Sequence, residues 1–156
     1  MSSEITNSQD IIDSRDVMAR IKELDEERES LANAFVVAQD ALYDPSKSEE
    51  VSEHKEAITD AQTELEDWDE ENGEELKNLK ALTEEGEGYG DWQHGATLIR
   101  DSYFEDYAKQ TAEDLGLISS ETQWPATCID WEKAAKELKQ DYTCVDFAGE
   151  DYYIRS

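Results

Sequence analysis

Residues 14–42 read SRDVMARIKELDEERESLANAFVVAQDAL, and the apolar side chains of this stretch recur at steps of three and four residues. Such spacing aligns them along one stripe of an α-helix. We therefore predict one long helix over these residues that packs along its stripe. The stripe contains Val17, Ile21, Leu24, Leu31, Phe35, Ala38 and Leu42, with Arg28 at one place where an apolar residue is expected.

A second helix of the same kind is predicted to follow. Pro45 ends the first helix because it lacks an amide hydrogen, and Ser46 with Glu49 forms a capping box for the second. Two stripes joined by so short a loop predict an antiparallel helical hairpin. Gly73 lowers helix propensity, so we expect a bend or break near Asn72 and Gly73. The second stripe falls on Val51, Ile58, Ala61, Leu65, Trp68, Leu79 and Leu82, with His54, Asn72 and Glu75 at its other positions.

The chain changes character near residue 88, where we place a domain boundary. Glycine occupies three of the five positions from 86 to 90, so residues 84–90 are typical of a linker. Before the boundary we expect an acidic helical hairpin, residues 1–88, with a mobile N-terminus over the first 13 residues. After it we expect a small α+β module, residues 89–156. The predicted fold class is therefore α+β: a coiled-coil-like helical hairpin is followed by this module.

The α+β module is predicted to contain two helices and three strands. Its expected elements are a strand over 97–99, a helix over 104–115 capped by Ser102 and Glu105 and closed by Gly116, a helix over 131–140 capped by Asp130, and a terminal β-hairpin over 142–147 and 152–154.

The net charge of the chain is −27, from 41 acidic and 14 basic side chains among 156 residues. A soluble domain needs a net charge of only about 2–8 in magnitude. Residues 1–88 carry 27 acidic and 8 basic side chains, a net −19, so the predicted hairpin is the stronger polyanion. Such a charge repels nucleic acids and nucleotides. We therefore expect no direct nucleic-acid binding, and a basic protein as the partner.

No set of residues has the spacing of a catalytic or metal site. Cys128 and Cys144 are the only thiols, and we expect them to be reduced and partly buried. The run from Asp67 resembles a calcium loop, but Asn72 and Asn78 occupy its diagnostic sixth and twelfth positions. We expect a protein that is not an enzyme and needs no cofactor or metal. No segment approaches the about 18 apolar residues of a membrane span, so we expect a cytoplasmic location and no membrane partner.

The acidic side chains are candidates for imitating the phosphates of DNA. A helix of about 28 residues extends ~42 Å, and the same length of duplex carries ~25 phosphates. A basic DNA-binding groove would therefore accept a rod with the charge of this hairpin. The candidate partner-binding acids are Glu64, Glu66, Asp67, Asp69, Glu70, Glu71, Glu74, Glu75, Glu84, Glu85 and Glu87, followed in the second module by Asp101, Glu105, Asp106, Glu113 and Asp114.

The last third of the chain also carries a distinctive set of packing and capping residues. The set is Tyr103, Phe104, Tyr107 and Ala108, then Asp114, Leu115 and Gly116, then Ile129, Asp130, Trp131, Ala134, Ala135 and Leu138, and finally Phe147, Gly149, Tyr152 and Tyr153. It resembles the carboxy-terminal part of ArdA-type antirestriction proteins over about 55 residues.

This resemblance implies a protein of a phage or mobile element that imitates DNA and inhibits host restriction complexes, usually as an elongated dimer. Only acids within the matching stretch, such as Glu105, Asp106, Glu113 and Asp114, inherit the mimicry role from it. The front half of the chain departs from the family, because a heptad-patterned hairpin replaces the additional α/β modules of ArdA proteins.

The leading hypothesis is an acidic DNA mimic that inhibits a host defence complex, such as a restriction nuclease or methyltransferase, by occupying its DNA-binding groove. The alternative is a coiled-coil adaptor whose acidity only keeps it soluble, and adaptation to high salt would also explain the acids. Competition with DNA should weaken as ionic strength rises, whereas an apolar contact should hold. Homodimerisation through the imperfect stripe, and whether the target belongs to a restriction or a CRISPR system, stay open.

Overall fold

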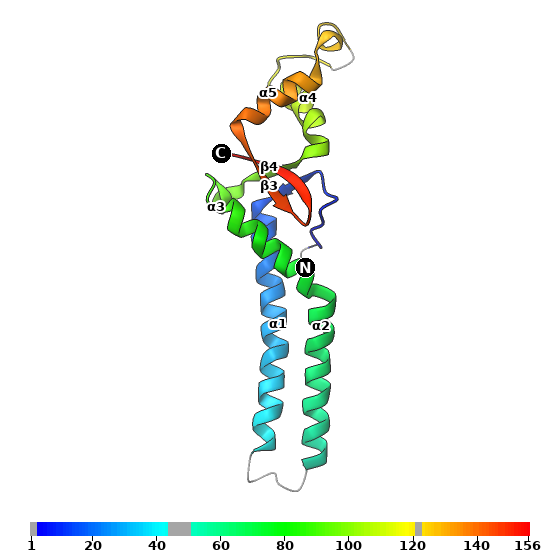
Figure 1. The fold of residues 1–156 in the computed structure, drawn as a ribbon, viewed down its shortest axis with the longest axis vertical. Helices are drawn as coiled ribbons and strands as arrows, with labels where there is room; N and C mark the ends of the chain where they lie inside the picture. The colour runs from blue at the N-terminus through cyan, green and yellow to red at the C-terminus, as the bar shows by residue number, and fades with distance from the viewer. Residues whose placement is uncertain (1–2, 44–50, 121–122) are drawn as a thin grey trace.

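The computed structural model describes residues 3–43, 51–120 and 123–156 and has an α+β fold (Figure 1). A long helical hairpin extends from a four-stranded antiparallel sheet, and two further helices lie beyond the sheet. The predicted fold class is therefore confirmed. The predicted helix stop at Pro45 and the capping box of Ser46 and Glu49 lie outside the described residues. None of the helices among the described residues is long and apolar enough to cross a membrane.

The hairpin consists of α1 (Ser14–Leu42) and α2 (Val51–Gly86), which pack side by side. Asp13 caps α1, because its carboxylate accepts a hydrogen bond from the Arg15 amide at 2.8 Å. Of the bend or break predicted near Asn72 and Gly73, the break does not occur, since α2 is continuous there. Its axis nevertheless bends between the part beside α1 and the part against the sheet (Figure 1). The side-chain amide of Asn72 donates a hydrogen bond to the Trp68 carbonyl at 3.3 Å. Such a side-chain contact with the preceding turn favours bending of the helix.

The sheet has the strand order β1-β2-β4-β3, with all neighbours antiparallel. Its strands are β1 (Ile11–Asp13), β2 (Thr97–Arg100), β3 (Tyr142–Phe147) and β4 (Glu150–Arg155). The predicted terminal hairpin is confirmed, and its turn places Ala148 and Gly149 at φ 51° and 86°. The expectation of a mobile lead is wrong for residues 11–13. They pair with β2 because this buries Ile12, which is only 3% exposed.

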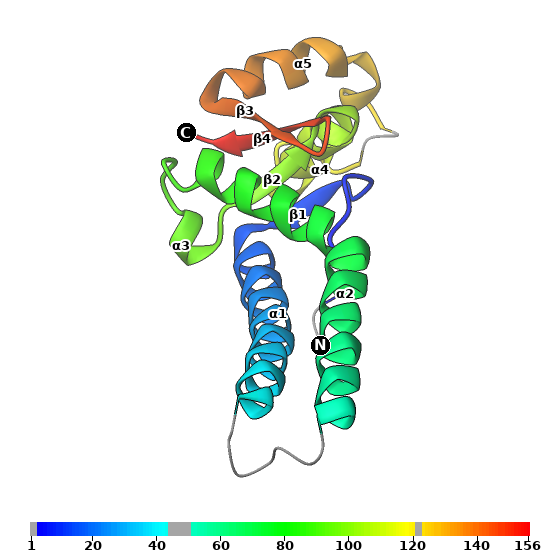
Figure 2. The ribbon, with the colours of Figure 1, turned by 60° about the horizontal axis from the view of Figure 1, so that its bottom comes forward.

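Helices cover both faces of the sheet (Figure 2). Leu98 and Ile99 point to opposite faces because side chains alternate along a strand. The Leu98 face packs against α1, α2 and the short helix α3 (Trp92–Gly95). The Ile99 face packs against α4 (Phe104–Asp114) and α5 (Trp131–Leu138). The sheet is therefore the middle layer between the hairpin base and the last two helices.

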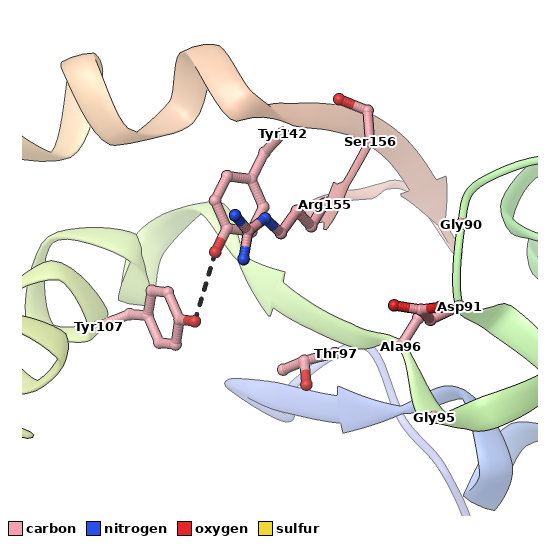
Figure 3. A pocket seen from close by; sticks show the side chains of 9 residues that line it. All are labelled: Gly90, Asp91, Gly95, Ala96, Thr97, Tyr107, Tyr142, Arg155 and Ser156. Atoms are coloured by element: carbon pink, nitrogen blue, oxygen red, sulfur yellow. Dashed lines mark hydrogen bonds between the residues drawn. The ribbon is translucent and has the colours of Figure 1, made fainter.

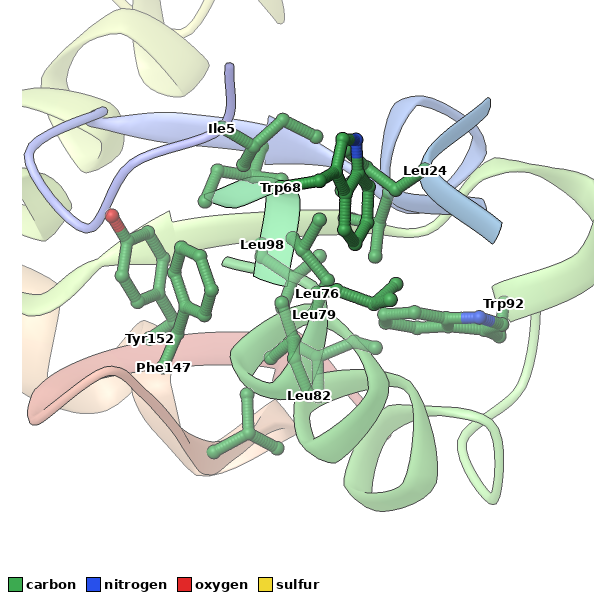
Figure 4. Close-up of a cluster of buried hydrophobic side chains, with 14 residues drawn as sticks. Ile5, Leu24, Trp68, Leu76, Leu79, Leu82, Trp92, Leu98, Phe147 and Tyr152 are labelled. Carbon is green, nitrogen blue, oxygen red and sulfur yellow. The ribbon is translucent and has the colours of Figure 1, made fainter. Parts of the chain in front are cut away.

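One hydrophobic core joins the hairpin to the sheet (Figure 4). Leu79 and Leu82 of α2 are fully buried there together with Tyr152 and Ile154 of β4. The core thus contains residues from both sides of position 88, although the domain boundary at that position stays a prediction. Trp92, 1% exposed, closes the core beside the end of α2.

Several local predictions can be compared with the structure. The linker over residues 84–90 begins later than expected, because α2 continues to Gly86. The cap of Ser102 and Glu105 is wrong: the 3-10 turn η2 (Asp101–Tyr103) precedes α4, which has no side-chain cap. Gly116 closes α4 as predicted, at φ 72°. The Gly116 amide donates a hydrogen bond to the Glu113 carbonyl, and the Leu117 amide donates one to the Ala112 carbonyl. These two hydrogen bonds form a Schellman motif. Asp130 caps α5 through the Lys133 amide, as predicted.

Candidate acidic interface on helix α2

The middle of α2 presents a row of exposed carboxylates. Trp68, Leu76 and Leu79 are buried on one side of this segment. Because a helix repeats every 3.6 residues, the positions between them point outward. Six of the predicted acids are exposed at such positions. We call this group the α2 acidic row, and it consists of Glu64, Glu66, Asp67, Glu70, Glu71 and Glu74.

The spacing of the row places like charges next to one another. Asp67, Glu70 and Glu74 follow at steps of three and four residues, which correspond to rises of about 4.5 and 6 Å along the helix axis. The phosphates of one DNA strand repeat at about 3.4 Å along the duplex axis, so the row is coarser than DNA by less than a factor of two. Carboxylates at this spacing destabilise a helix by a few tenths of a kcal/mol per pair. The row is therefore a feature that helix stability alone does not favour.

The α2 acidic row is not neutralised from within the described part of the chain. Its carboxylates take no part in the ion pairs between described residues. Glu66 accepts a hydrogen bond from the Gln62 side chain at 2.7 Å, which leaves its charge intact. Within residues 3–43, 51–120 and 123–156, no cation therefore offsets the negative charge of the row.

Asp69 and Glu75, predicted as partner-binding acids, instead hold the hairpin together. Arg20 binds Glu75 through two hydrogen bonds, of 2.9 and 3.1 Å. Arg28 binds Asp69 in the same bidentate way, at 2.7 and 3.0 Å. Hydrogen bonding to these carboxylates raises the pKa of both arginines. We therefore assign Asp69 and Glu75 to the contact between α1 and α2.

Sequence reasoning missed these two arginine clamps. Arg28 was noticed only as a polar interruption of the first stripe. Its partner is 41 positions away in the sequence, so the pairing follows only once the register of the two helices is known. The available signal was that Arg28 and Glu75 both occupy stripe positions, where a charged side chain needs a partner.

The acids at the end of α2 form a second group, separated from the row by Lys77 and Lys80. Glu84 and Glu87 are exposed, and Glu85 accepts a hydrogen bond from the Asp146 amide of β3 at 3.1 Å. The last turn of α2 contains no basic residue. Acids at this end oppose the helix dipole, so their placement costs stability.

The acids of the second module divide by their surroundings. Asp101 pairs with Lys139 at 2.5 Å. Glu105 and Asp106 lie in the first turn of α4, where the dipole favours them, and both are within 4 Å of Lys109. Glu113 and Asp114 are exposed at the opposite, unfavourable end of α4.

The sixteen predicted acids therefore do not form one array. The helix α4 lies on the opposite face of the sheet from α2, so its acids face another direction (Figure 2). The α2 acidic row is the longest group that remains exposed and unpaired among the described residues. It is the strongest part of the predicted site.

A polar cavity of about 390 Å³ lies at the edge of the sheet (Figure 3). Its lining includes Asp91 and Arg155, and the hydroxyl groups of Tyr107 and Tyr142 are 3.4 Å apart in its wall. Burial, and then the contact with Tyr107, raises the pKa of Tyr142. Its hydroxyl therefore stays protonated near neutral pH and cannot serve there as a general base. Sequence reasoning did not bring these four residues together.

The cysteines and the acidic clusters offer no further site. The expectation that Cys128 and Cys144 are partly buried is wrong, since both are free and exposed. Although Cys144 is exposed as a residue, nearby protein atoms desolvate its sulfur and raise the pKa of the thiol, which lowers its reactive thiolate fraction. No group of three metal-ligating side chains occurs among residues 3–43, 51–120 and 123–156.

Comparisons with protein-family models, curated proteins and solved structures find no match to this chain. The resemblance to the carboxy-terminal part of ArdA-type proteins therefore stays a prediction.

Proposed function

We propose that the protein is an acidic inhibitor that occupies the basic DNA-binding groove of a defence complex, such as a restriction nuclease or methyltransferase. The observation that carries this proposal is the α2 acidic row: six exposed carboxylates on one helix, without a cation from the described chain. The acids have a cost in helix stability, and a cationic partner would offset it.

The physical basis is the same as that of DNA binding. A basic groove that accepts a row of fixed negative charges releases the anions bound to its own lysines and arginines, and the long-range field speeds the encounter. The proposed interaction must therefore weaken steeply with added salt. An adaptor that works through apolar contacts would keep its affinity under the same conditions.

The first prediction concerns displacement of DNA from a restriction methyltransferase complex, followed by fluorescence anisotropy of a labelled cognate duplex. We expect the protein to displace the duplex at low salt and to do so much less well at about 200 mM salt. The variant Glu66→Gln, Asp67→Asn, Glu70→Gln, Glu71→Gln and Glu74→Gln should lose at least about tenfold in potency, because it removes five of the charges that meet the groove.

A matched control separates the row from bulk charge. Asp10, Glu29, Glu132, Glu137 and Asp141 are exposed acids outside the row. Their combined exchange for Gln or Asn removes the same charge and should change the potency by no more than about threefold. Equal losses of potency in both variants would show that only the net charge matters and not the position of the row. Undiminished displacement by the row variant would contradict the proposal.

A further inference from the structure

The polar cavity at the edge of the sheet contains an arginine without a counterion (Figure 3). Four of the five arginines in the chain each form an ion pair with a carboxylate: Arg15, Arg20, Arg28 and Arg100. Arg155 forms no ion pair with any described carboxylate, although acids outnumber basic residues by 41 to 14. A guanidinium stays charged and carries five N–H donors. Those of Arg155 are therefore available to a ligand in the cavity.

Two tyrosine hydroxyl groups line the same cavity. The strand register sets Tyr142 of β3 opposite Arg155 of β4, and Figure 3 shows the arginine side chain extending toward that tyrosine. Tyr107 comes from α4. The two hydroxyl oxygens are 3.4 Å apart, whereas an O–H···O hydrogen bond is typically about 2.7–2.8 Å long. Both hydroxyls can therefore turn toward an acceptor that also meets Arg155.

The cavity also has a carboxylate in its lining. Asp91 precedes α3, but its side chain makes no capping hydrogen bond. It forms no ion pair with any residue in the described ranges, Arg155 included, although both line one cavity. Figure 3 shows Asp91 across the cavity from the two tyrosines. The cavity thus presents two separated charges of opposite sign.

We propose that this cavity binds a free α-amino acid. The carboxylate of the ligand accepts hydrogen bonds from Arg155 and from the two tyrosine hydroxyls. Its ammonium group donates to Asp91. The volume of about 390 Å³ lies within the range of small-molecule pockets. Gly90, Gly95 and Ala96 add no long side chain to the lining, which leaves room for the side chain of the ligand.

Charge favours a zwitterion over a simple anion or a simple amine. The net charge of −27 repels multiply charged anions such as phosphate. An amino acid has an ionised carboxylate and a protonated amine near neutral pH, so it carries no net charge. A simple anion would bring a like charge toward Asp91, and a simple amine would leave Arg155 without a partner. This inference does not depend on the proposed function, because the cavity and the α2 acidic row share no residue.

Titration of the ¹⁵N-labelled 156-residue chain with each of the common L-amino acids, followed by ¹H–¹⁵N correlation NMR, tests the inference. We expect at least one of them to shift the amide signals of Thr97, Tyr142 and Arg155 saturably at millimolar concentration. The analogues of that amino acid without the amine or without the carboxylate should each bind at least about tenfold more weakly. Inorganic phosphate should give no saturable shift at these residues.

The variants R155Q and D91N should each weaken binding of the same amino acid at least about tenfold, because each removes one charged partner. The variant Y107F/Y142F should weaken it about threefold or more, through loss of the two hydroxyl donors. K77Q and E132Q are the charge-matched controls. Both residues are exposed on other helices and lie outside the cavity lining, so these variants should bind as the native chain does.

Several results would overturn the inference. They are the absence of a saturable shift with every amino acid, binding of phosphate or of the analogue without the amine as tight as that of the amino acid, and native affinity in R155Q or D91N. Asp91 and Arg155 are exposed, so both variants should fold, and their NMR spectra show directly whether they do. Y107F/Y142F keeps both rings and both charges, so native affinity in this variant would equally contradict the proposed contacts.

Discussion

The close approach of Gly86 to Trp92 fixes the place where α2 meets α3. A Cβ atom at position 86 would overlap the indole ring of Trp92. Ser14 secures the same junction from α1, since its hydroxyl donates to the Trp92 carbonyl at 2.7 Å and accepts from the Ala96 amide at 2.7 Å. The three residues join both helices of the hairpin to the start of β2. Close contacts among Ser14, Gly86 and Trp92 therefore hold the base of the hairpin against the sheet.

The second prediction compares alanine at two glycines of α2. Gly86→Ala should lower the free energy of unfolding by about 1–3 kcal/mol, because the added methyl group overpacks the junction. Gly73 has open space around it, so Gly73→Ala should raise that free energy by up to about 1 kcal/mol through helix propensity. Urea unfolding followed by circular dichroism measures both. Equal effects at the two positions would show that the junction is looser than described.

At the level of elements, the two arginine clamps set the register of α1 against α2. Arg20 and Glu75 are 13% and 12% exposed, whereas Arg28 and Asp69 are 45% and 40% exposed. The inner clamp lies close to the hydrophobic core and the outer clamp lies in solvent. The same geometry therefore has different energetic consequences at the two positions.

The third prediction follows from this difference in burial. Arg20→Met should destabilise the protein by about 2–4 kcal/mol, because it leaves the carboxylate of Glu75 largely buried without a counterion. Arg28→Met should cost less than about 1 kcal/mol, because water solvates Asp69. The double variant Arg20→Met with Glu75→Leu should recover most of the loss. Similar losses for the two arginines in thermal or urea unfolding would contradict this assignment.

The elements that sequence predicts well are those with a long repeating pattern. The helical hairpin follows from heptad spacing sustained over α1 and α2, and the terminal β-hairpin follows from alternation with a glycine turn. The strand β1 escapes prediction because it has only three residues and is held by its partner rather than by its own sequence. The continuation of α2 to Gly86 escapes it because Trp92, from beyond the helix, fills the space that the glycine leaves.

The candidate site is predictable to the same limited degree. Sequence identifies the acids of α2, and the helical period orders them along a face. Which acids stay free depends on the register between the helices, and this register diverts Asp69 and Glu75 to Arg28 and Arg20. The separation of the α4 acids from the α2 acids depends on the layering of the sheet, which no local pattern encodes.

At the scale of the whole molecule, acidity and apolar surface are kept apart. The α2 acidic row lies on one helix of the hairpin, whereas the outer part of the other helix, residues 30–43, carries Asp40 as its single charge. The proposed inhibitor uses the acidic surface for a cationic groove. Salt should therefore weaken this contact.

The most direct test of the account is carboxylate footprinting of the protein in complex with a restriction methyltransferase, with carbodiimide coupling read out by mass spectrometry. The account predicts that Glu66, Asp67, Glu70, Glu71 and Glu74 become protected from coupling in the complex, while Glu132 and Glu137 keep their free-state reactivity. Unchanged reactivity of the α2 acids, with or without protection elsewhere, would contradict the claim that this row occupies the DNA-binding groove.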